Sequence, residues 1–256
     1  MRDLNLMRTK REDQKSTTAS MKGKTAVITG ANSGVGFEAA ISIGRAGGHV
    51  VMVCRNPKKA EDARAQIVER TGAEVDVVLG DLSDMVEVRK LCADLLERFP
   101  KIHVLINNAG LHSTVRSETR EGFETVFAVN HLAPFLMTLL LLDRLKESAP
   151  ARIINVSSQG HRFNGLDLND VHWEQRKYRG LKGYGAAKTA NLMFTWDLAE
   201  QLRGSGVTVV AQHPGAVKTG IGLNNGAIYR AWHNNVTMLF LQDASIAGDA
   251  LYYLAA

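Results

Sequence analysis

A tyrosine and a lysine four positions apart are the most informative residues of this chain. Tyr184 and Lys188 share one face if the segment that holds them is helical. A phenol titrates near ~10 in water, and a neighbouring ammonium group favours its ionised form and so lowers its pKa. Such a phenol can give a proton to a carbonyl oxygen or take one from an alcohol. The pattern alone also fits an ordinary surface helix, so other residues have to decide.

A glycine-rich turn near the N-terminus predicts dinucleotide binding. It lies between a strand-like and a helix-like segment and reads Thr29, Gly30, Ala31, Asn32, Ser33, Gly34, Val35, Gly36. Gly30 permits a tight turn, Gly34 lets the backbone approach a pyrophosphate, and Gly36 lets helix and strand pack closely. The following helix offers free N–H groups and its positive dipole end to phosphates. In this context a glycine-rich loop without function is the weaker interpretation.

The elements that must position these residues alternate along the chain. Apolar β-rich runs predict strands over 24–28, 49–54, 75–79, 102–106, 152–156 and 207–211. Segments of helical period predict helices over 34–45, 58–69, 85–98, 122–146 and 184–202. The strand runs are apolar throughout, as expected when both faces of a sheet are covered. We therefore predict an α/β fold, a single-domain Rossmann-type doubly wound parallel sheet with helices on both faces.

Further motifs, in order, resemble those of the short-chain dehydrogenase/reductase family. Members of that family carry Thr-Gly-x-x-x-Gly-x-Gly, as residues 29–36 do, and the resemblance covers roughly residues 22–256. The later motifs are Asp81-Leu82, the Asn-Asn-Ala-Gly stretch 107–110, Asn130, Ser157-Ser158, Tyr184 with Lys188, and the His-Pro-Gly-Ala-Val-Lys-Thr stretch 213–219. Several independent motifs in the family's order make the tyrosine–lysine pair far more specific than it is alone.

The resemblance implies a nicotinamide dinucleotide cofactor held along this series of motifs. Its phosphates and adenine would contact Gly30, Asn32, Ser33, Gly34, Val35, Gly36, Asp81 and Leu82. The remaining contacts would fall on Asn108, Ala109, Gly110, Tyr184, Lys188, Pro214, Gly215, Val217 and Thr219. Among these, Val217 and Thr219 match positions that fix the carboxamide.

The end of the second predicted strand favours NADP(H) over NAD(H). An NAD-preferring site places a carboxylate there to bond the ribose 2′-hydroxyl, and residues 53–56 contain none. Arg55 instead offers a planar fork of donors that suits a 2′-phosphate. A solvated arginine at a strand end is the alternative.

The family's catalytic roles transfer to four residues. Tyr184 would be the proton donor or acceptor, and Lys188 would lower its pKa and bond the nicotinamide ribose. Ser158, rather than Ser157, would orient the substrate oxygen, and Asn130 would help to hold a water in a proton relay. Two plainer interpretations stay open, since Asn130 can bond backbone inside its helix and Ser158 can serve as a turn residue.

The substrate side resembles the retinol-dehydrogenase-like branch of the family. The stretch between Ser158 and Tyr184 is longer than in many members, and residues 130–132 and 190–192 also match the branch. The resemblance implies an apolar aldehyde, ketone or alcohol as substrate. Trp173 and Tyr178 either line a pocket or anchor the long loop. Residues 220–242 match the family's lid, whose apolar side chains suit a lipophilic substrate or, less well, a membrane surface.

Composition fits one globular domain. The chain has 256 residues, 45% of them hydrophobic, and we expect a flexible arm over 1–21 and the domain over 22–256. The formal charge of +5 owes much to that basic arm, so it is poor evidence for nucleic-acid binding. Two cysteines show neither metal spacing nor a disulfide framework. No uninterrupted apolar run reaches the ~18–20 residues that span a bilayer, so we predict a cytoplasmic protein without metal or transmembrane segment.

The leading prediction is an NADP(H)-dependent oxidoreductase that interconverts a carbonyl and an alcohol. Two features depart from the branch: the arm is charged where many relatives carry a membrane anchor, and the chain ends inside the last expected helix, so it is either naturally short or truncated. A catalytically idle NADP(H)-binding interaction protein is the main alternative. A nucleotide-sugar epimerase fits less well, because those chains have other glycine spacing and a larger substrate domain. Apolar residues within 192–196 predict a homo-oligomer.

Overall fold

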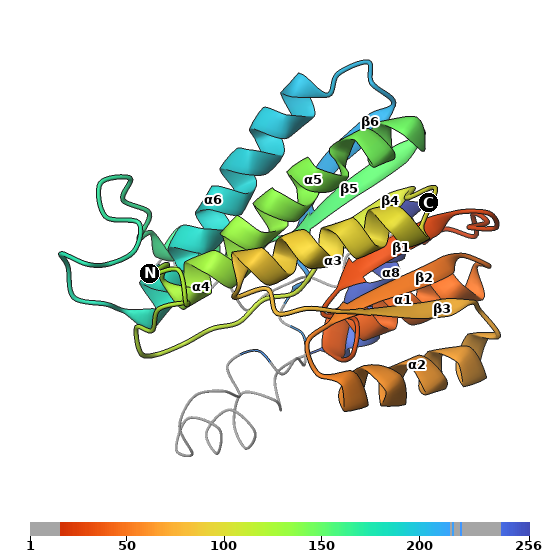
Figure 1. Ribbon diagram of the computed structural model, residues 1–256, viewed down its shortest axis with the longest axis horizontal. Coiled ribbons are helices and arrows are strands. Elements are labelled where there is room, and N and C mark those ends of the chain that lie inside the picture. The colour runs from red at the N-terminus through yellow and green to blue at the C-terminus, as the bar shows by residue number, and fades with distance from the viewer. Residues whose placement is uncertain (1–15, 216, 218–220, 222–241) are drawn as a thin grey trace.

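The fold is built on one sheet of six parallel strands. The structure is a computed structural model that describes residues 16–215, 217, 221 and 242–256. In these residues the strand order is β3-β2-β1-β4-β5-β6. The strands are β1 Thr25–Thr29, β2 His49–Cys54, β3 Val75–Leu79, β4 Val104–Asn107, β5 Ala151–Val156 and β6 Val207–Gln212. The parallel, doubly wound sheet predicted from the apolar runs is thus confirmed (Figure 1).

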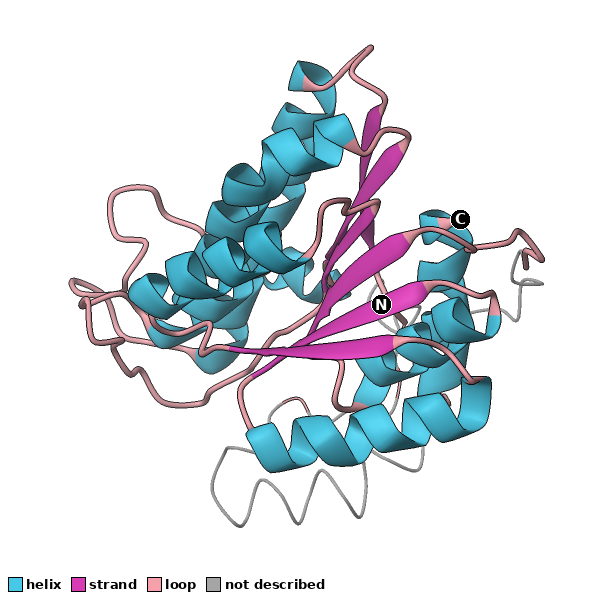
Figure 2. Cartoon of the chain, turned by 45° about the vertical axis from the view of Figure 1, so that its right-hand side comes forward, coloured by secondary structure: helices cyan, strands magenta, loops and turns pink. Residues whose placement is uncertain are grey.

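Helices cover both faces of the sheet (Figure 2). One face carries α1 Gly34–Arg45, α2 Pro57–Thr71 and α8 Ala244–Ala255, and the other carries α3 Met85–Arg98, α5 Ala133–Glu147 and α6 Gly180–Gln201. Neighbouring residues of a strand enter different cores: Ile28 joins the α1 side, whereas Val27 joins the α3 side. Both faces need apolar side chains, which is why the strands read as continuous apolar runs.

The chain reverses direction across the sheet between β1 and β4. The β1–β2–β3 half is built outward on one side of β1, and β4 then pairs with β1 on its other side. In an open parallel sheet, the carboxyl ends of the strands leave a crevice at such a reversal point, and ligands bind there. The glycine turn follows β1 and the Asn-Asn-Ala-Gly stretch follows β4, so the topology places both at this crevice.

The helix expected over 122–146 is interrupted by a π-helical turn. A short α4, Thr125–Phe127, leads into the π-helical turn η2, Ala128–Leu132, and then into α5. Pro134 has no N–H to donate to the carbonyl of Asn130 four residues earlier, and its ring would crowd that carbonyl in a regular helix. The wider turn accommodates the proline, and it places Asn130 at the irregular point.

That helical segment also bears on membrane crossing. Within the described residues, the span Thr125–Glu147 is long and apolar enough to cross a bilayer by length and composition, although polar residues interrupt its apolar run. In this structure just over half of its apolar 18-residue window is buried inside the protein. It packs against α3 and the sheet, as the core helix of a globular protein does.

The described part of the N-terminal segment packs onto the domain. Met21, the last residue that we assigned to the arm, is fully buried, and its N–H donates to the carbonyl of Ala46 at 2.9 Å. The hydroxyl of Tyr252 in α8 donates to the carbonyl of Ala19. The packed body therefore begins no later than Met21.

Candidate active site

A cleft of about 420 Å³ opens at the carboxyl edge of the sheet, where the topology predicts a ligand site. Most of the residues proposed for the cofactor line it: Gly30, Asn32, Ser33, Gly34, Val35, Arg55, Asp81, Leu82, Asn108, Ala109, Gly110, Tyr184, Lys188, Pro214, Gly215 and Val217. Ser158, proposed for catalysis, lines it as well. Thr219 and most of the proposed lid lie outside the described residues. Segments far apart in the sequence thus meet around one cavity.

The glycine turn has the backbone geometry that a close ligand approach requires. Gly30 and Gly34 have φ angles of +67° and +58°, which residues with a side chain adopt at a cost. Ser33 precedes α1, and its side chain does not cap the helix, so it does not compete with a ligand for the first N–H groups. Free amides at a helix N-terminus form a site for phosphates.

Gly36 does not line the cleft but holds its floor together. A Cβ atom there would lie 2.5 Å from Nδ2 of Asn108 and 2.7 Å from the carbonyl of Gly30. Only a glycine therefore allows α1 to pack this closely on the ends of β1 and β4. The role expected for Gly36, close packing of helix and strand, matches this contact.

Thr29 joins the two strands at the reversal point, and the sequence pattern did not predict this role for its side chain. Its Oγ1 accepts hydrogen bonds from the backbone N–H groups of Asn108 and Ala109, both at 2.9 Å. The side chain of Asn108 returns a bond to the carbonyl of Thr29 at 2.8 Å. These bonds fix the two loops that carry the cofactor residues. The Thr-Gly pair after β1 and the Asn-Asn pair after β4 are the sequence features that could have indicated this link.

The far end of the cleft holds Arg55 and Asp81. The Arg55 side chain is 65% exposed, and its Nη1 lies 3.6 Å from Oδ2 of Asp81. Oδ1 of Asp81 accepts bonds from the backbone N–H and the hydroxyl of Ser83. Cys54 and Gly80 also line this end and were missed, because they carry no side-chain chemistry that predicts a site. Arg55 is thus available at the mouth of the cleft.

The other end of the cleft brings Tyr184, Lys188 and Ser158 together. Tyr184 and Lys188 both project from α6, as the spacing predicts, and Ser158 follows β5. Lys188 is only 3% exposed, and its Nζ donates to the carbonyl of Val156 at 2.7 Å. The same Nζ lies 5.6 Å from the centroid of the Tyr184 ring.

Burial dominates the pKa values at this end. Burial raises the pKa of Tyr184 above its usual value, and a hydrogen bond with the Ser158 side chain opposes the rise. Burial also lowers the pKa of Lys188 to about 8. In this structure the net pKa of Tyr184 is raised by burial, whereas the spacing of Tyr184 and Lys188 predicted a lowered pKa. The pair needs a further charge or hydrogen bond, such as a bound cofactor supplies, before the phenol becomes a good acid–base group.

Two neighbours of Tyr184 were not anticipated. The ring of His112 meets the Tyr184 ring edge-on at 5.9 Å, and burial lowers the pKa of this histidine. A Cβ atom at Gly160 would lie 2.6 Å from Cε1 of Tyr184. Both residues hold the phenol ring in place, and no sequence pattern pointed to either.

Asn130 stands behind the cleft. It is 1% exposed, and its side chain makes two bonds to Leu111, accepting from the N–H at 2.8 Å and donating to the carbonyl at 2.9 Å. A Cβ atom at Gly110 would lie 3.3 Å from Oδ1 of Asn130 and 3.7 Å from Nζ of Lys188. Both polar atoms therefore border the same small space beside Gly110.

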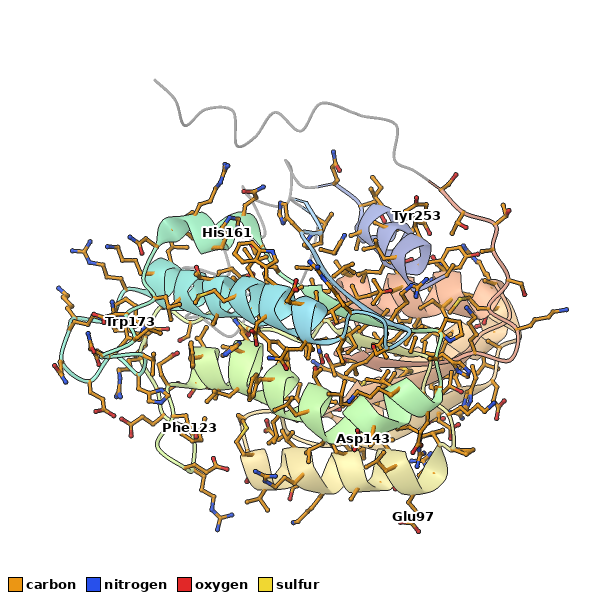
Figure 3. All side chains as sticks on the ribbon, turned by 90° about the horizontal axis from the view of Figure 1, so that it is seen from above. Glu97, Phe123, Asp143, His161, Trp173 and Tyr253 are labelled. Atoms are coloured by element: carbon orange, nitrogen blue, oxygen red, sulfur yellow. The ribbon has the colours of Figure 1, made fainter. Side chains whose placement is uncertain are left out.

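The long loop before α6 is anchored on the body through its aromatic residues. Trp173 is 4% exposed and packs edge-on against Tyr178 at 5.5 Å, while the Arg176 guanidinium lies 3.7 Å from the centre of its ring. The hydroxyl of Tyr178 donates to the buried carboxylate of Glu124 at 3.1 Å. Figure 3 shows Trp173 at the end of the molecule where α6 begins. Neither aromatic residue lines the cleft, so the anchoring interpretation holds.

The cleft fits an extended dinucleotide. An uncapped helix N-terminus and glycines with positive φ lie at one point along it, with a cationic fork at one end and a buried ammonium group at the other. Pro214, Gly215 and Val217 complete its wall after β6. The donor set therefore suits a ligand with a central pyrophosphate and a ribose at each end.

Comparison with known proteins agrees with this geometry. The family model described as short chain dehydrogenase matches residues 24–227. Human retinol dehydrogenase 13 is 39% identical over 93% of this chain and 73% of its own length, and mouse retinol dehydrogenase 12 is 43% identical over 84% and 68%. The structure of a Sphingobium yanoikuyae short-chain dehydrogenase in complex with NADPH has a TM-score of 0.70, with 26% identity, 88% coverage of this chain and 82% of that one. The chain therefore belongs to the short-chain dehydrogenase family, and it is an oxidoreductase that uses a nicotinamide cofactor on alcohol or carbonyl groups.

Proposed function

We propose that this protein is an NADP(H)-dependent oxidoreductase that interconverts a lipophilic aldehyde or ketone and the corresponding alcohol. The observation that carries the proposal is the convergence of Ser158, Tyr184 and Lys188 at one end of the cleft whose other features suit a dinucleotide. An idle NADP(H)-binding protein would need the glycine turn but would not need this set of groups.

The bound cofactor supplies or receives the hydride, and the protein supplies position and a proton. The Ser158 hydroxyl orients and polarises the substrate oxygen. Tyr184 gives its proton to that oxygen during reduction and takes it back during oxidation. With the cofactor bound, Lys188 would hold the nicotinamide ribose, and its charge would stabilise the phenolate. The space beside Gly110, between Asn130 and Lys188, suits a water that returns the proton.

Arg55 supports NADP(H) over NAD(H). Its exposed guanidinium stands at the mouth of the cleft, beyond the end of β2, where an NAD-preferring site would place a carboxylate. Asp81, 3.6 Å away, orients the guanidinium without being positioned at the end of β2 itself. A planar fork of N–H donors matches a 2′-phosphate.

The substrate class rests on the relatives. Relatives about 40% identical include human retinol dehydrogenase 13 and mouse retinol dehydrogenase 12, so a long apolar aldehyde or alcohol such as retinal or retinol is the first substrate to test. The assay follows NADPH oxidation over a panel of retinal, aliphatic aldehydes of increasing length, ketones and quinones. Turnover that improves with chain length supports the lipophilic class.

The decisive variant is Tyr184→Phe. It removes the proton donor and keeps the ring that packs against Gly160, so NADPH affinity should stay within about twofold while kcat falls by about 10³-fold to 10⁴-fold. Full activity in this variant would refute the mechanism. Tight NADPH binding with no turnover by the wild-type protein on a broad panel would favour the idle binder.

The outer faces of α5 and α6 support a homo-oligomer. Four large apolar side chains are exposed there, namely Phe135, Leu139, Met193 and Trp196, and the last is 67% exposed. A patch of this kind on adjacent helices suits a second copy of the chain. A monomeric mass by light scattering at micromolar concentration would contradict this.

We place the protein in the cytoplasm, and recovery in the membrane fraction after cell lysis would contradict that assignment.

A further inference from the structure

A buried asparagine one helical turn beyond Lys188 joins α6 to the π-helical turn. Asn191 is 4% exposed, and its Nδ2 donates to the backbone carbonyl of Asn130 at 2.8 Å. Its Oδ1 lies 3.1 Å from Nδ1 of His131. Both of its polar atoms are therefore engaged with two consecutive residues of the π-helical turn. No part of the mechanism above uses Asn191.

The carbonyl that Asn191 bonds would otherwise lack its usual partner. In a regular helix the carbonyl of Asn130 would accept from the N–H of residue 134, which is a proline. A buried acceptor without a donor costs free energy, so a donor from a neighbouring element stabilises this carbonyl. Nδ2 of Asn191 is that donor, from the neighbouring helix. The bond thus follows from the Asn130–Pro134 spacing.

The carbonyl of Asn130 sets which way the Asn191 amide points, and His131 supports that orientation. Because the carbonyl of Asn130 can only accept, the Asn191 atom facing it must be the NH₂ group, and Oδ1 must face His131. Nδ1 of His131 then has to carry a proton. The ring is held by Phe127 and Phe194, whose centroids lie 5.1 and 6.4 Å from its own.

Asn191 shares its helix face with the two residues proposed to handle the proton. Tyr184, Lys188 and Asn191 stand at positions i, i+4 and i+7 of α6, which lie along one side of a helix. The side chain of Asn130, in turn, is committed to Leu111 by two bonds. One amide therefore ties the helix that carries Tyr184 and Lys188 to the turn that carries Asn130.

From this geometry we infer that Asn191 is a positioning residue for the reaction, supported by His131. It holds α6 and the π-helical turn in the register that brings Asn130 and Lys188 to the same space beside Gly110. The inference rests on the proposed function for its effect on turnover, since a misplacement of about 1 Å in a proton-transfer site can cost ~100-fold in rate. The hold on Asn130 itself is independent of that function.

The test compares Asn191→Leu with Thr195→Val. Leucine keeps the volume and removes the donor, so kcat should fall about 10-fold to 100-fold while the NADPH dissociation constant changes less than about twofold. Thr195 is a matched control. It is 3% exposed on the same helix. Its hydroxyl bonds the carbonyl of Asn191 and the amide of Asn155, and among the described residues it makes no hydrogen bond to Asn130 or His131. Thr195→Val should lose thermal stability to a similar degree and keep kcat within about twofold.

A second readout needs neither substrate nor cofactor. The N–H of Leu111 donates to Asn130, so hydrogen–deuterium exchange of the peptide containing Leu111 should speed up in Asn191→Leu and stay unchanged in Thr195→Val. If Tyr184→Phe stays active, the proposed function fails, and this exchange still tests the hold on Asn130. If Tyr184→Phe is inactive but Asn191→Leu matches Thr195→Val in kcat and exchange, only the present inference is overturned.

Two substitutions of His131 test the inference if Asn191→Leu does not fold. His131→Phe keeps an aromatic ring among Phe127 and Phe194 but removes the donor to Asn191, and it should lower kcat by up to about 10-fold. His131→Asn places an amide donor near the former Nδ1 and should restore most of the loss. Equal rates in both variants and in the wild-type protein would overturn the role of His131 and, with it, the inference.

Discussion

The two ends of the cleft each hold a cation, and the two cations are in opposite surroundings. Arg55 at the adenosine end is 65% exposed and pairs with a half-exposed carboxylate at 3.6 Å. Lys188 at the catalytic end is 3% exposed, bonds the carbonyl of Val156 at 2.7 Å, and has a pKa lowered to about 8 by burial. The cleft thus holds one positive charge exposed to water and one buried in the protein interior.

This difference in burial assigns selection of the cofactor to Arg55 and a part in the reaction to Lys188. An exposed cation is screened by water and salt, so it can choose between two cofactors without much cost to stability. A buried cation costs free energy to maintain, and it acts strongly on the groups beside it because the surroundings are poorly polarisable. We therefore expect changes at Lys188 to alter rate and stability, and changes at Arg55 to alter cofactor preference alone.

Of the two cations, Lys188 is expected to give the larger effect on rate, which Lys188→Met tests. Methionine fills a similar volume without the charge, so Tyr184 keeps its raised pKa when the cofactor binds and the proton transfer slows. We expect kcat to fall by about 10²-fold to 10³-fold, measured under saturating NADPH. A kcat within a few-fold of the wild-type value would show that the buried cation has no part in the chemistry.

Burial of Lys188 also predicts how stability depends on pH. The pKa of lysine is 10.5 in water and falls to about 8 at Lys188 in the folded protein, so between these values the unfolded chain binds a proton that the folded protein lacks. The free energy of unfolding should therefore rise with pH from about 8 to about 10.5, by about 3 kcal/mol relative to Lys188→Met. Burial raises the pKa of Cys54 and Cys92, which lowers stability above pH 9 in both proteins and cancels in the difference.

Chemical denaturation of the cofactor-free proteins over pH 7–10.5 measures this difference. A constant gap between wild-type and Lys188→Met across the range would mean that Lys188 keeps an ordinary pKa. The buried end of the cleft would then resemble the exposed one, and the contrast between the two cations would be lost.

The sequence was sufficient for the sheet and for most residues of the cleft. The strands over His49–Cys54 and Val75–Leu79 and the helices over Gly34–Arg45 and Met85–Arg98 agree with the predicted bounds. Such segments are set by local features, namely apolar runs, caps such as Asp84 and turns such as Gly72 with φ of +66°. Motifs after successive strands converge because parallel strands end at one edge.

Long-range packing accounts for what the sequence did not reveal. Pro134 marks the irregular point of the helix, but the bond from Asn191 to the carbonyl of Asn130 joins residues far apart in the chain, and helical periodicity does not reveal it. His112 and Gly160 contact Tyr184 only because three separate segments meet there. The pKa of Tyr184 was misjudged because spacing gives the neighbour's charge but not the burial that outweighs it. The roles of Trp173 and Tyr178 likewise depended on Glu124 and Arg176.

Arg55→Asp is expected to give the smaller effect of the two cations and the sharpest contrast with Lys188. The change removes the fork of donors and places a carboxylate beyond the end of β2, where it repels a 2′-phosphate and can accept from a ribose 2′-hydroxyl. We expect the ratio of kcat/KM for NADPH over NADH to fall by about 10-fold to 50-fold. The melting temperature should change little, because the side chain is 65% exposed.

Arg45→Asp is the matched control, since Arg45 is exposed at the opposite end of α1 from the cleft. It makes the same change in net charge, so any general electrostatic effect on the anionic cofactors appears in both variants. Raising the salt concentration should weaken NADPH binding to the wild-type protein more than to Arg55→Asp, because the exposed contact is screened. If Arg55→Asp kept the wild-type preference for NADPH over NADH, Arg55 would not be the residue that selects the cofactor. Equal shifts in both variants would assign it to net charge rather than to a bond with the 2′-phosphate.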